Sequence, residues 1–173
     1  MDLKKIIRHV QDFPKKGIGF KDITPLLADG PAFSMAIEQM AQRFAHDPID
    51  RVLGIESRGF IFAAALARAR GIGIIPVRKP GKLPCRTIRE TYQLEYGEDA
   101  LEIHADALTP DQRVLIVDDL LATGGTAAAT VRLVRRTGAA VAGCCFLVEL
   151  DFLHGRELLA GTRVESLIHF ESE

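Results

Sequence analysis

Cysteine is scarce in this sequence, with three residues among 173. Cys144 and Cys145 are adjacent within an apolar run, and Cys85 has no obvious partner elsewhere. An odd number of cysteines placed in this way argues against a disulfide framework, which small secreted domains often need. The cysteines therefore favour a protein of a reducing compartment.

Long apolar runs are also missing. No stretch approaches the roughly 20 residues that a membrane-spanning helix needs. The first residues, Met1-Asp2-Leu3-Lys4-Lys5, carry charge and lack the apolar core of a signal peptide. We therefore expect a cytoplasmic protein that makes no use of a membrane.

Metal-ligand spacing and a large excess of charge are absent as well. The five histidines are scattered along the chain, which argues against a zinc site. The formal net charge is −1, which argues against a surface that binds nucleic acid. The basic residues are nevertheless concentrated in one segment, residues 78–97, which has five basic residues and two acidic ones. This segment suggests a small anionic ligand, although charge alone is equally compatible with a solvated loop.

The hydrophobic pattern predicts an α/β fold in a single domain. Leu3, Ile6, Ile7 and Val10 recur at helical spacing, so we expect an opening amphipathic helix. A second helix should begin at Pro31, after Asp29-Gly30. Beyond it, short apolar runs (52–55, 73–77, 113–117 and 140–150) alternate with helical stretches (59–70 and 126–137). Such alternation indicates βαβ units and a central, mainly parallel sheet flanked by helices, with ligands bound beyond the carboxyl ends of its strands.

Residues 118–126 are the most informative loop. An apolar run ends in Asp118-Asp119, and the chain then reads Leu-Leu-Ala-Thr-Gly-Gly-Thr before a helix. Gly124 and Gly125 let the backbone turn its N–H groups toward an anion, and the helix N-terminus adds a favourable dipole. The loop has neither the lysine of a Walker A motif nor the G-x-G-x-x-G pattern.

The two aspartates restrict the ligand further. They would repel a bare phosphate, but an ionised carboxylate accepts hydrogen bonds from hydroxyl groups. A phosphate beside a vicinal diol describes a ribose 5-phosphate. The alternative is a helix cap with a flexible turn, although caps commonly use one Asp or Thr rather than this whole set.

Three other segments carry possible site residues. Ser57 precedes a helix and could cap it, whereas Arg58 at the same helix start opposes the dipole unless an anion binds there. Residues 91–96 alternate with a period of two, which suggests a strand of a small flap that closes over the ligand. Phe20, in a polar segment rich in glycine, is either a core anchor or a face for a planar ligand.

On these residues the chain resembles the type I phosphoribosyltransferases. Residues 114–126 are similar to their signature for 5-phosphoribosyl pyrophosphate (PRPP), in the form characteristic of the adenine-specific branch, and the resemblance extends from Phe13 to about Glu149. It implies one domain over residues 1–173, with a small N-terminal hood (about 1–30) and a flexible flap (about 80–100). The implied reaction converts adenine and PRPP to AMP and pyrophosphate in purine salvage, with Mg²⁺ bound through PRPP. The resemblance also implies a homodimer.

The same resemblance implies roles for individual residues. Glu95 would be the general acid/base, with Tyr96 and Arg58 beside it in catalysis, and the Glu56–Ser57 peptide could be cis. Adenine would contact Gly19, Phe20, Lys21 and Leu120, although relatives usually carry a bulky aliphatic residue where this chain has Gly19. PRPP and AMP would be bound by Arg58, Arg78, Lys79, Lys82, Asp118, Asp119, Ala122, Thr123, Gly124, Gly125 and Thr126.

Two other functions stay open from the sequence. A phosphoribosyltransferase for another base would share the PRPP loop and differ in the hood. A non-catalytic sensor of PRPP or purines would share the fold, but such regulators usually add a DNA-binding domain, for which 173 residues leave no room.

Overall fold

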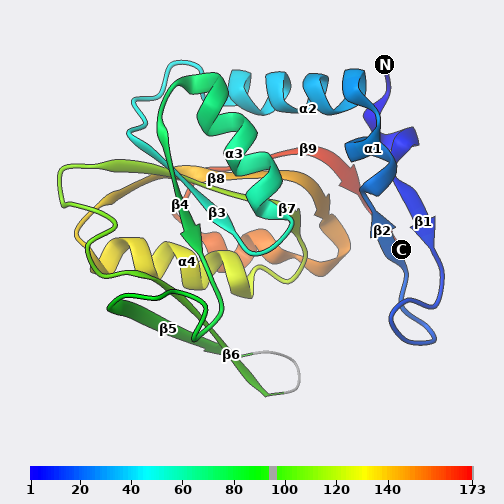
Figure 1. Ribbon diagram of the computed structural model, residues 1–173. Helices are drawn as coiled ribbons and strands as arrows, with labels where there is room; N and C mark the ends of the chain where they lie inside the picture. The colour runs from blue at the N-terminus through cyan, green and yellow to red at the C-terminus, as the bar shows by residue number, and fades with distance from the viewer. Residues whose placement is uncertain (94–96, 173) are drawn as a thin grey trace.

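A parallel five-stranded sheet forms the centre of the molecule (Figure 1). The computed structural model describes residues 1–93 and 97–172. The strand order is β4-β3-β7-β8-β9. The strands are β3 (Arg51–Ile55), β4 (Gly73–Val77), β7 (Arg113–Leu121), β8 (Ala140–Leu150) and β9 (Val164–Phe170). The predicted α/β architecture is confirmed.

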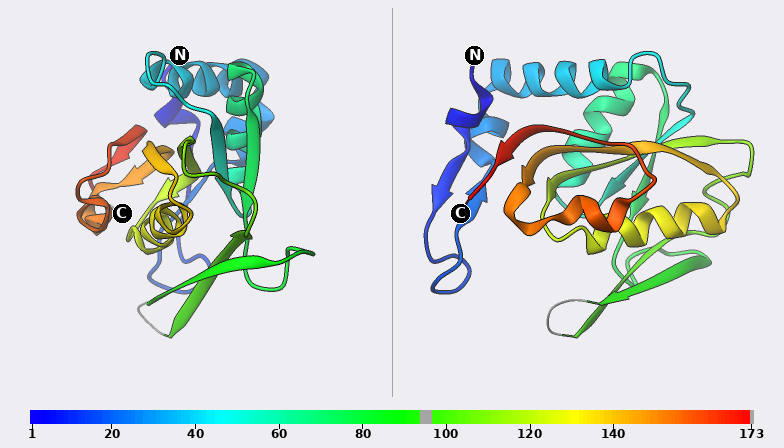
Figure 2. Two further views of the ribbon diagram at one scale, coloured as in Figure 1. Left: turned by 90° about the vertical axis from the view of Figure 1, so that its left-hand side faces the viewer. Right: turned by 180° about the vertical axis from the view of Figure 1, so that it is seen from behind.

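Helices cover both faces of this sheet, as the two views of Figure 2 show. The helices are α1 (Thr24–Ala28), α2 (Gly30–Arg43), α3 (Gly59–Arg70) and α4 (Gly125–Arg136). One apolar cluster packs α2 and α3 against the sheet, and a second packs α4 against the opposite face. Strands covered on both faces need continuous apolar runs, which explains why β3 and β8 were visible in the sequence. None of the helices in the described part of the chain is long and apolar enough to cross a membrane.

The predicted opening helix is wrong. The chain makes one short 3₁₀ turn, η1 (Leu3–Ile6), and then extends as β1 (Arg8–Val10). This strand pairs antiparallel with β2 (Phe20–Asp22), and Arg8 forms an ion pair with Asp22. The strand pairing and the burial of Leu3 override the helical spacing of the apolar residues.

The strand predicted at 113–117 is longer than expected. β7 continues to Leu121 because β8 runs beside it and pairs Asp118 with Phe146 and Leu120 with Val148. The two aspartates therefore belong to a central strand rather than to the loop after it. A strand gives a side chain a more fixed direction than a loop does.

A two-stranded antiparallel hairpin, β5 (Thr87–Gln93) and β6 (Glu98–His104), projects from the α4 side of the sheet (Figure 1). The hairpin is anchored at both ends, since Tyr92, near the end of β5, and Leu101 and Ile103 on β6 are buried in the cluster that contains α4. The two-residue period predicted a strand over residues 91–96, which is confirmed for residues 91–93 at the end of β5, whereas 94–96 lie outside the described residues. Two short 3₁₀ turns, η2 (Asp151–Leu153) and η3 (Gly155–Leu159), connect β8 to β9.

Candidate active site

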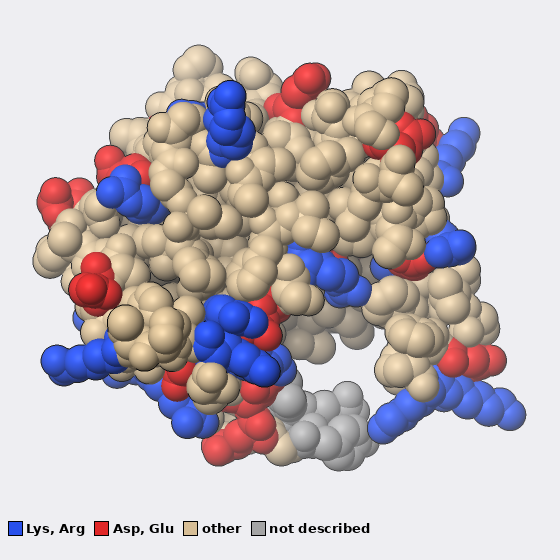
Figure 3. All heavy atoms as spheres, in the orientation of Figure 1, with Lys and Arg blue, Asp and Glu red and all other residues tan. Residues whose placement is uncertain are grey.

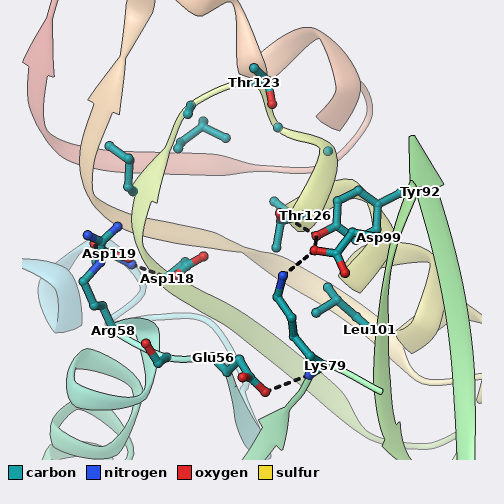
Figure 4. Close-up of a pocket in the computed structure, with 17 residues that line it drawn as sticks. Glu56, Arg58, Lys79, Tyr92, Asp99, Leu101, Asp118, Asp119, Thr123 and Thr126 are labelled. Atoms are coloured by element: carbon teal, nitrogen blue, oxygen red, sulfur yellow. Dashed lines mark hydrogen bonds and ion pairs between the residues drawn. The ribbon is translucent and has the colours of Figure 1, made fainter. Parts of the chain in front are cut away.

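A cavity of about 500 Å³ lies between the ends of the central strands and the β5–β6 hairpin, from which Tyr92, Asp99 and Leu101 line it (Figure 4). This is the carboxyl edge of the parallel sheet, where α/β folds bind their ligands. The lining residues come from the turns after β3 and β4, the end of β7, the start of α4 with the loop before it, and the hairpin: Glu56, Ser57, Arg58, Lys79, Tyr92, Asp99, Leu101, Asp118, Asp119, Leu120, Leu121, Ala122, Thr123, Gly124, Gly125, Thr126 and Ala127.

The glycine-rich loop before α4 forms one end of the cavity. Gly124 has a φ of 84°, a left-handed conformation that glycine adopts without strain. The loop also rests on η3, because a Cβ built on Gly124 would lie 2.2 Å from the carbonyl oxygen of Gly155. A Cβ on Gly155 would lie equally close to the carbonyl oxygen of Ala122. The two glycines thus allow the two backbones to touch, and this contact fixes the position of the glycine-rich loop relative to η3.

The paired aspartates lie at the end of β7. Asp119 is 5% exposed, and its Oδ2 lies 2.7 Å from Nε of Arg58. Asp118 keeps part of its surface free, and its Oδ1 accepts a hydrogen bond from the Asp119 amide at 2.9 Å. Its other neighbour, Gly59, has no room for a side chain, since a Cβ there would lie 2.5 Å from Oδ1 of Asp118.

Burial raises the pKa of both aspartates. The charge of Asp119 raises the pKa of Asp118 further, well above its usual value. For Asp119 the guanidinium of Arg58 opposes the effect of burial on the pKa. Two adjacent carboxylates, of which only Asp119 is paired with the Arg58 cation, form a site that is stabilised by hydroxyl donors and by additional positive charge.

Arg58 comes from the turn between β3 and α3. The Glu56–Ser57 peptide in this turn is cis, as the resemblance implied. The expected helix cap by Ser57 is wrong: Arg58 occupies the N-cap position, and no side chain caps the helix. The Arg58 guanidinium also lies 5.3 Å from the ring centre of Phe20, so it connects the N-terminal hairpin to the cavity.

The basic segment after β4 contributes one cation to the cavity. Lys79 lines it and donates a hydrogen bond to Asp99. Arg78 instead turns to Oε2 of Glu56, 3.1 Å away, and the same oxygen accepts the Lys79 amide at 2.7 Å. Glu56 thereby joins the loops after β3 and β4. Lys82 is exposed and does not line the cavity.

The residues expected to contact adenine are divided between the cavity and the hood. Leu120 lines the cavity, whereas Gly19, Phe20 and Lys21 do not. Phe20 packs edge-on against Phe13, with ring centres 5.1 Å apart. The Lys21 ammonium lies near His9 and over the Phe170 ring, toward the C-terminal strand. Glu95 and Tyr96 lie outside the residues that the structure describes.

Four residues at the site were not found by sequence reasoning: Tyr92, Asp99, Leu101 and Gly155. The alternating pattern indicated that Tyr92 faces away from Thr91 and Gln93, but not what it touches. Nothing in the sequence marks Asp99, because it reaches the cavity only when the hairpin folds back on the sheet. Gly155 belongs to η3, about thirty residues further along the chain than the glycine-rich loop that it contacts.

Possible metal ligands are grouped at a different place. Within residues 1–93 and 97–172, Glu149, Asp151 and His169 are the group close enough to hold an ion together. Arg156 already occupies both oxygens of Glu149, at 2.6 and 2.8 Å. The cavity carboxylates Glu56, Asp99 and Asp119 are likewise paired with basic side chains. A metal would therefore find more free oxygens on a phosphate ligand than on the described protein atoms.

The charges on the face of the molecule seen in Figure 1 are mixed. Figure 3 shows lysine and arginine side chains interspersed with aspartate and glutamate over the coloured atoms of this face. A surface of both signs creates no extended positive field of the kind that attracts a polyanion.

Sequence comparison finds one family over most of the chain. Residues 26–159 match the model of the phosphoribosyl transferase domain. The adenine phosphoribosyltransferase of Desulfitobacterium hafniense is 56% identical over 170 residues, covering 98% of each chain. That of Syntrophotalea carbinolica is 57% identical, covering 98% of this chain and 99% of the relative.

Solved structures agree with the sequence relatives. Adenine phosphoribosyltransferase from Thermoanaerobacter pseudethanolicus superposes with a TM-score of 0.95 at 53% identity, covering 97% of this chain and 98% of the other. The Saccharomyces cerevisiae enzyme, solved with an imino-altritol bisphosphate and adenine, gives a TM-score of 0.89 at 40% identity and 95% coverage of each chain.

Proposed function

The chain belongs to the phosphoribosyltransferase family, and we propose that its cavity transfers the 5-phosphoribosyl group of PRPP to adenine, with AMP and pyrophosphate as products. Adenine phosphoribosyltransferases cover nearly its whole length at more than half identity. The observation that carries the proposal is one cavity that joins paired aspartates to a glycine-rich helix start. These are the two groups that a ribose 5-phosphate requires.

The 5-phosphate is proposed to bind at the start of α4. The backbone N–H groups from Thr123 to Thr126 would surround it, together with the hydroxyls of the two threonines. The positive end of the α4 dipole favours the anion by about 0.3–1 kcal/mol, more where the site is partly buried. The contact between Gly124 and Gly155 supports this assignment because it holds the glycine-rich loop in a fixed position relative to η3.

The ribose is proposed to bind Asp118 and Asp119 through its 2- and 3-hydroxyls. The transition state should resemble an oxocarbenium ion, so positive charge develops on the sugar. Two carboxylates next to that charge stabilise it more than they stabilise the ground state. Their ionised form beside the sugar is favoured by Arg58, which is hydrogen-bonded to Asp119.

Pyrophosphate is proposed to leave toward Arg58 and Lys79, with Arg78 and Lys82 nearby on the same basic loop. Each charged hydrogen bond to the leaving group is worth about 1.5–3 kcal/mol. Mg²⁺ is proposed to enter as the salt of PRPP, because three of the four described cavity carboxylates (Glu56, Asp99 and Asp119) are paired with basic side chains and Mg²⁺ commonly binds through substrate phosphates.

Adenine is proposed to stack on Phe20 and to pack its other face against Leu120, with backbone groups at Gly19 and Lys21 reading its edge. The position of Leu120 in the cavity and the contact of Phe20 with Arg58 support this placement. Gly19 removes an apolar wall that relatives usually have. Glu95 is proposed to exchange a proton with the purine, and Tyr96 to orient the reacting groups.

We further propose that residues 1–30 act as a hood and 80–100 as a flap within one domain. From the family resemblance we propose a homodimer, a cytoplasmic location and a place in purine salvage. We also propose that the protein has no nucleic-acid or membrane partner.

One reaction mixture distinguishes an enzymatic function of this chain from a sensor function. Protein, PRPP, Mg²⁺ and adenine should release pyrophosphate and form AMP in equal amounts. A sensor would bind PRPP and release no pyrophosphate. A transferase for another base would release pyrophosphate only when adenine is replaced by that base.

A further inference from the structure

Asp99 lies inside the cavity on β6, although no motif of the sequence points to it. Its Oδ2 accepts hydrogen bonds from the Lys79 ammonium and from the Tyr92 hydroxyl, the latter at 3.3 Å. Its Oδ1 accepts the Ala100 amide at 2.8 Å. Figure 4 shows the carboxylate between Lys79 and Tyr92, on the flap side of the cavity. Both oxygens of Asp99 are therefore engaged by donors.

The hydrogen bonds of Asp99 connect two ends of the active site. Tyr92 also accepts a hydrogen bond from Oγ1 of Thr126 at 3.2 Å, in the first turn of α4. The ring of Tyr92 packs on Gly125, where an added Cβ would lie 3.3 Å from Cδ2. A single chain of contacts thus runs from Lys79 to the proposed phosphate loop.

The cavity holds more negative than positive side chains. Its described lining includes four carboxylates (Glu56, Asp99, Asp118 and Asp119) and two cations (Arg58 and Lys79). Both cations are already paired, Arg58 with Asp119 and Lys79 with Asp99. A pyrophosphate group that binds these cations must compete with the protein's own carboxylates.

The Lys79–Asp99 pair is suited to such an exchange. The hydrogen bond to Asp99 raises the pKa of Lys79. Burial alone would raise the pKa of Asp99, but the bonds from Lys79 and the Ala100 amide outweigh it and lower that pKa. Both groups are therefore charged at neutral pH. The Lys79 side chain is 51% exposed, and ion pairs so close to solvent are weak enough to break readily.

We propose that Asp99 is an exchangeable counterion of Lys79, which pyrophosphate displaces when it binds and which takes Lys79 back when pyrophosphate leaves. This inference rests on the proposed function, in which Lys79 binds the pyrophosphate of PRPP. After the exchange Asp99 keeps the Tyr92 hydroxyl and the Ala100 amide, so its carboxylate is not left without donors. Asp99 thereby lowers the affinity for pyrophosphate and favours its release.

The test is titration calorimetry with inorganic pyrophosphate at fixed free Mg²⁺. Asp99→Asn removes the charge and keeps one acceptor oxygen for Lys79 and Tyr92, while an NH2 group replaces the oxygen that accepts the Ala100 amide. We expect it to bind pyrophosphate about fivefold more tightly than the wild type. Asp99→Ser removes the same charge with a smaller side chain and should shift the affinity in the same direction. A gain in affinity cannot result from misfolding.

Glu98→Gln is the matched control. Glu98 is the neighbouring residue on β6, it does not line this cavity, and its change removes the same charge. Its affinity for pyrophosphate should stay within about twofold of the wild type, since exposed charges act weakly over distance. An equal gain in Glu98→Gln would overturn the proposal in favour of a general charge effect.

Lys79→Ala separates this inference from the proposed function. If Lys79→Ala leaves pyrophosphate binding unchanged, Lys79 is not a pyrophosphate ligand, and both statements fail. If Lys79→Ala weakens binding but neither Asp99 variant binds more tightly, only the counterion role fails. In the Lys79→Ala background, Asp99→Asn should no longer increase the affinity for pyrophosphate. An increase as large as in the wild-type background would show that Asp99 does not act through Lys79.

Discussion

Arg58 and Asp119 come from different strand ends, and their side chains meet in the cavity with Nε 2.7 Å from Oδ2. The pair joins the turn after β3 to the end of β7, the two loops proposed to bind pyrophosphate and ribose. Burial raises the pKa of Asp119, and the charge of Arg58 opposes this rise, so the cation favours the charged form of its partner. The reactive parts of PRPP would thus meet groups that are already oriented toward one another.

Asp119→Asn should therefore impair catalysis more than folding. The variant keeps the shape of the side chain and loses the charge beside the cationic sugar. We expect kcat/KM to fall by about 100-fold, the usual effect of losing one preorganised electrostatic group. Steady-state kinetics and thermal unfolding check this, with the exposed Asp111→Asn as control. Unchanged kcat/KM would remove Asp119 from its assigned role.

Asp118 should make the stability of the protein depend on pH. Burial and the charge of Asp119 raise its folded-state pKa above the usual 3.8. The folded state therefore holds the proton more tightly, and ionisation of Asp118 costs stability as pH rises above about 4. Asp118→Asn removes this cost, so its Tm should exceed that of the wild type at pH 7 and approach it at pH 4. A difference that is larger at pH 4 would contradict the raised pKa.

The contact between Gly155 and the phosphate loop should be sensitive to one methyl group. Gly155 has no positive φ, so its backbone conformation suits alanine, but the new Cβ would lie 2.2 Å from the Ala122 oxygen. Gly155→Ala must displace the loop, and we expect the KM for PRPP to rise about tenfold, or ~1.4 kcal/mol.

Gly30→Ala is the control for this change, because nothing lies within 4 Å of a Cβ at Gly30. Its KM should equal that of the wild type. If Gly155→Ala also leaves the KM unchanged while the protein stays folded, the loop does not depend on its contact with η3.

Glu95→Gln tests the general acid/base. Proton transfer by a positioned side chain contributes about 100-fold or more to the rate, so kcat should fall by that factor. The KM for PRPP should change little, because the glutamate is proposed to act on the purine. Glu98→Gln, three residues further along the chain, should retain full kcat. Equal loss in both variants would point to a disturbed flap rather than to acid/base catalysis.

Much of the fold could be predicted because parallel strands covered on both faces produce continuous apolar runs. The bounds of α3, β4 and β8 were correct to the residue. The prediction of an opening helix failed because the pairing of β1 with β2 stabilises the segment more than a helix with only four regularly spaced apolar residues would. The predicted end of β7 was wrong because Asp118 and Asp119 interrupt the apolar run, whereas pairing with β8 continues the strand through them to Leu121.

The site was predictable where one continuous segment contains both the ligand groups and the glycines of the turn. Residues 118–126, from the end of β7 to the start of α4, are such a segment, and all of them line the cavity. Arg58 and Lys79 were visible as cations at strand ends. Asp99, Tyr92 and Gly155 were not, because their places at the site depend on contacts between distant segments that leave no local pattern.

The most direct measurement of the central claim is kcat/KM for a panel of bases, with PRPP-dependent release of pyrophosphate as the signal. The panel contains adenine, hypoxanthine, guanine, xanthine, orotate and uracil. A pocket with a buried acceptor for the 6-amino group should prefer adenine to hypoxanthine by at least ~100-fold, because hypoxanthine would leave that acceptor unpaired. Comparable turnover of the two bases, or turnover of another base alone, would contradict the adenine assignment.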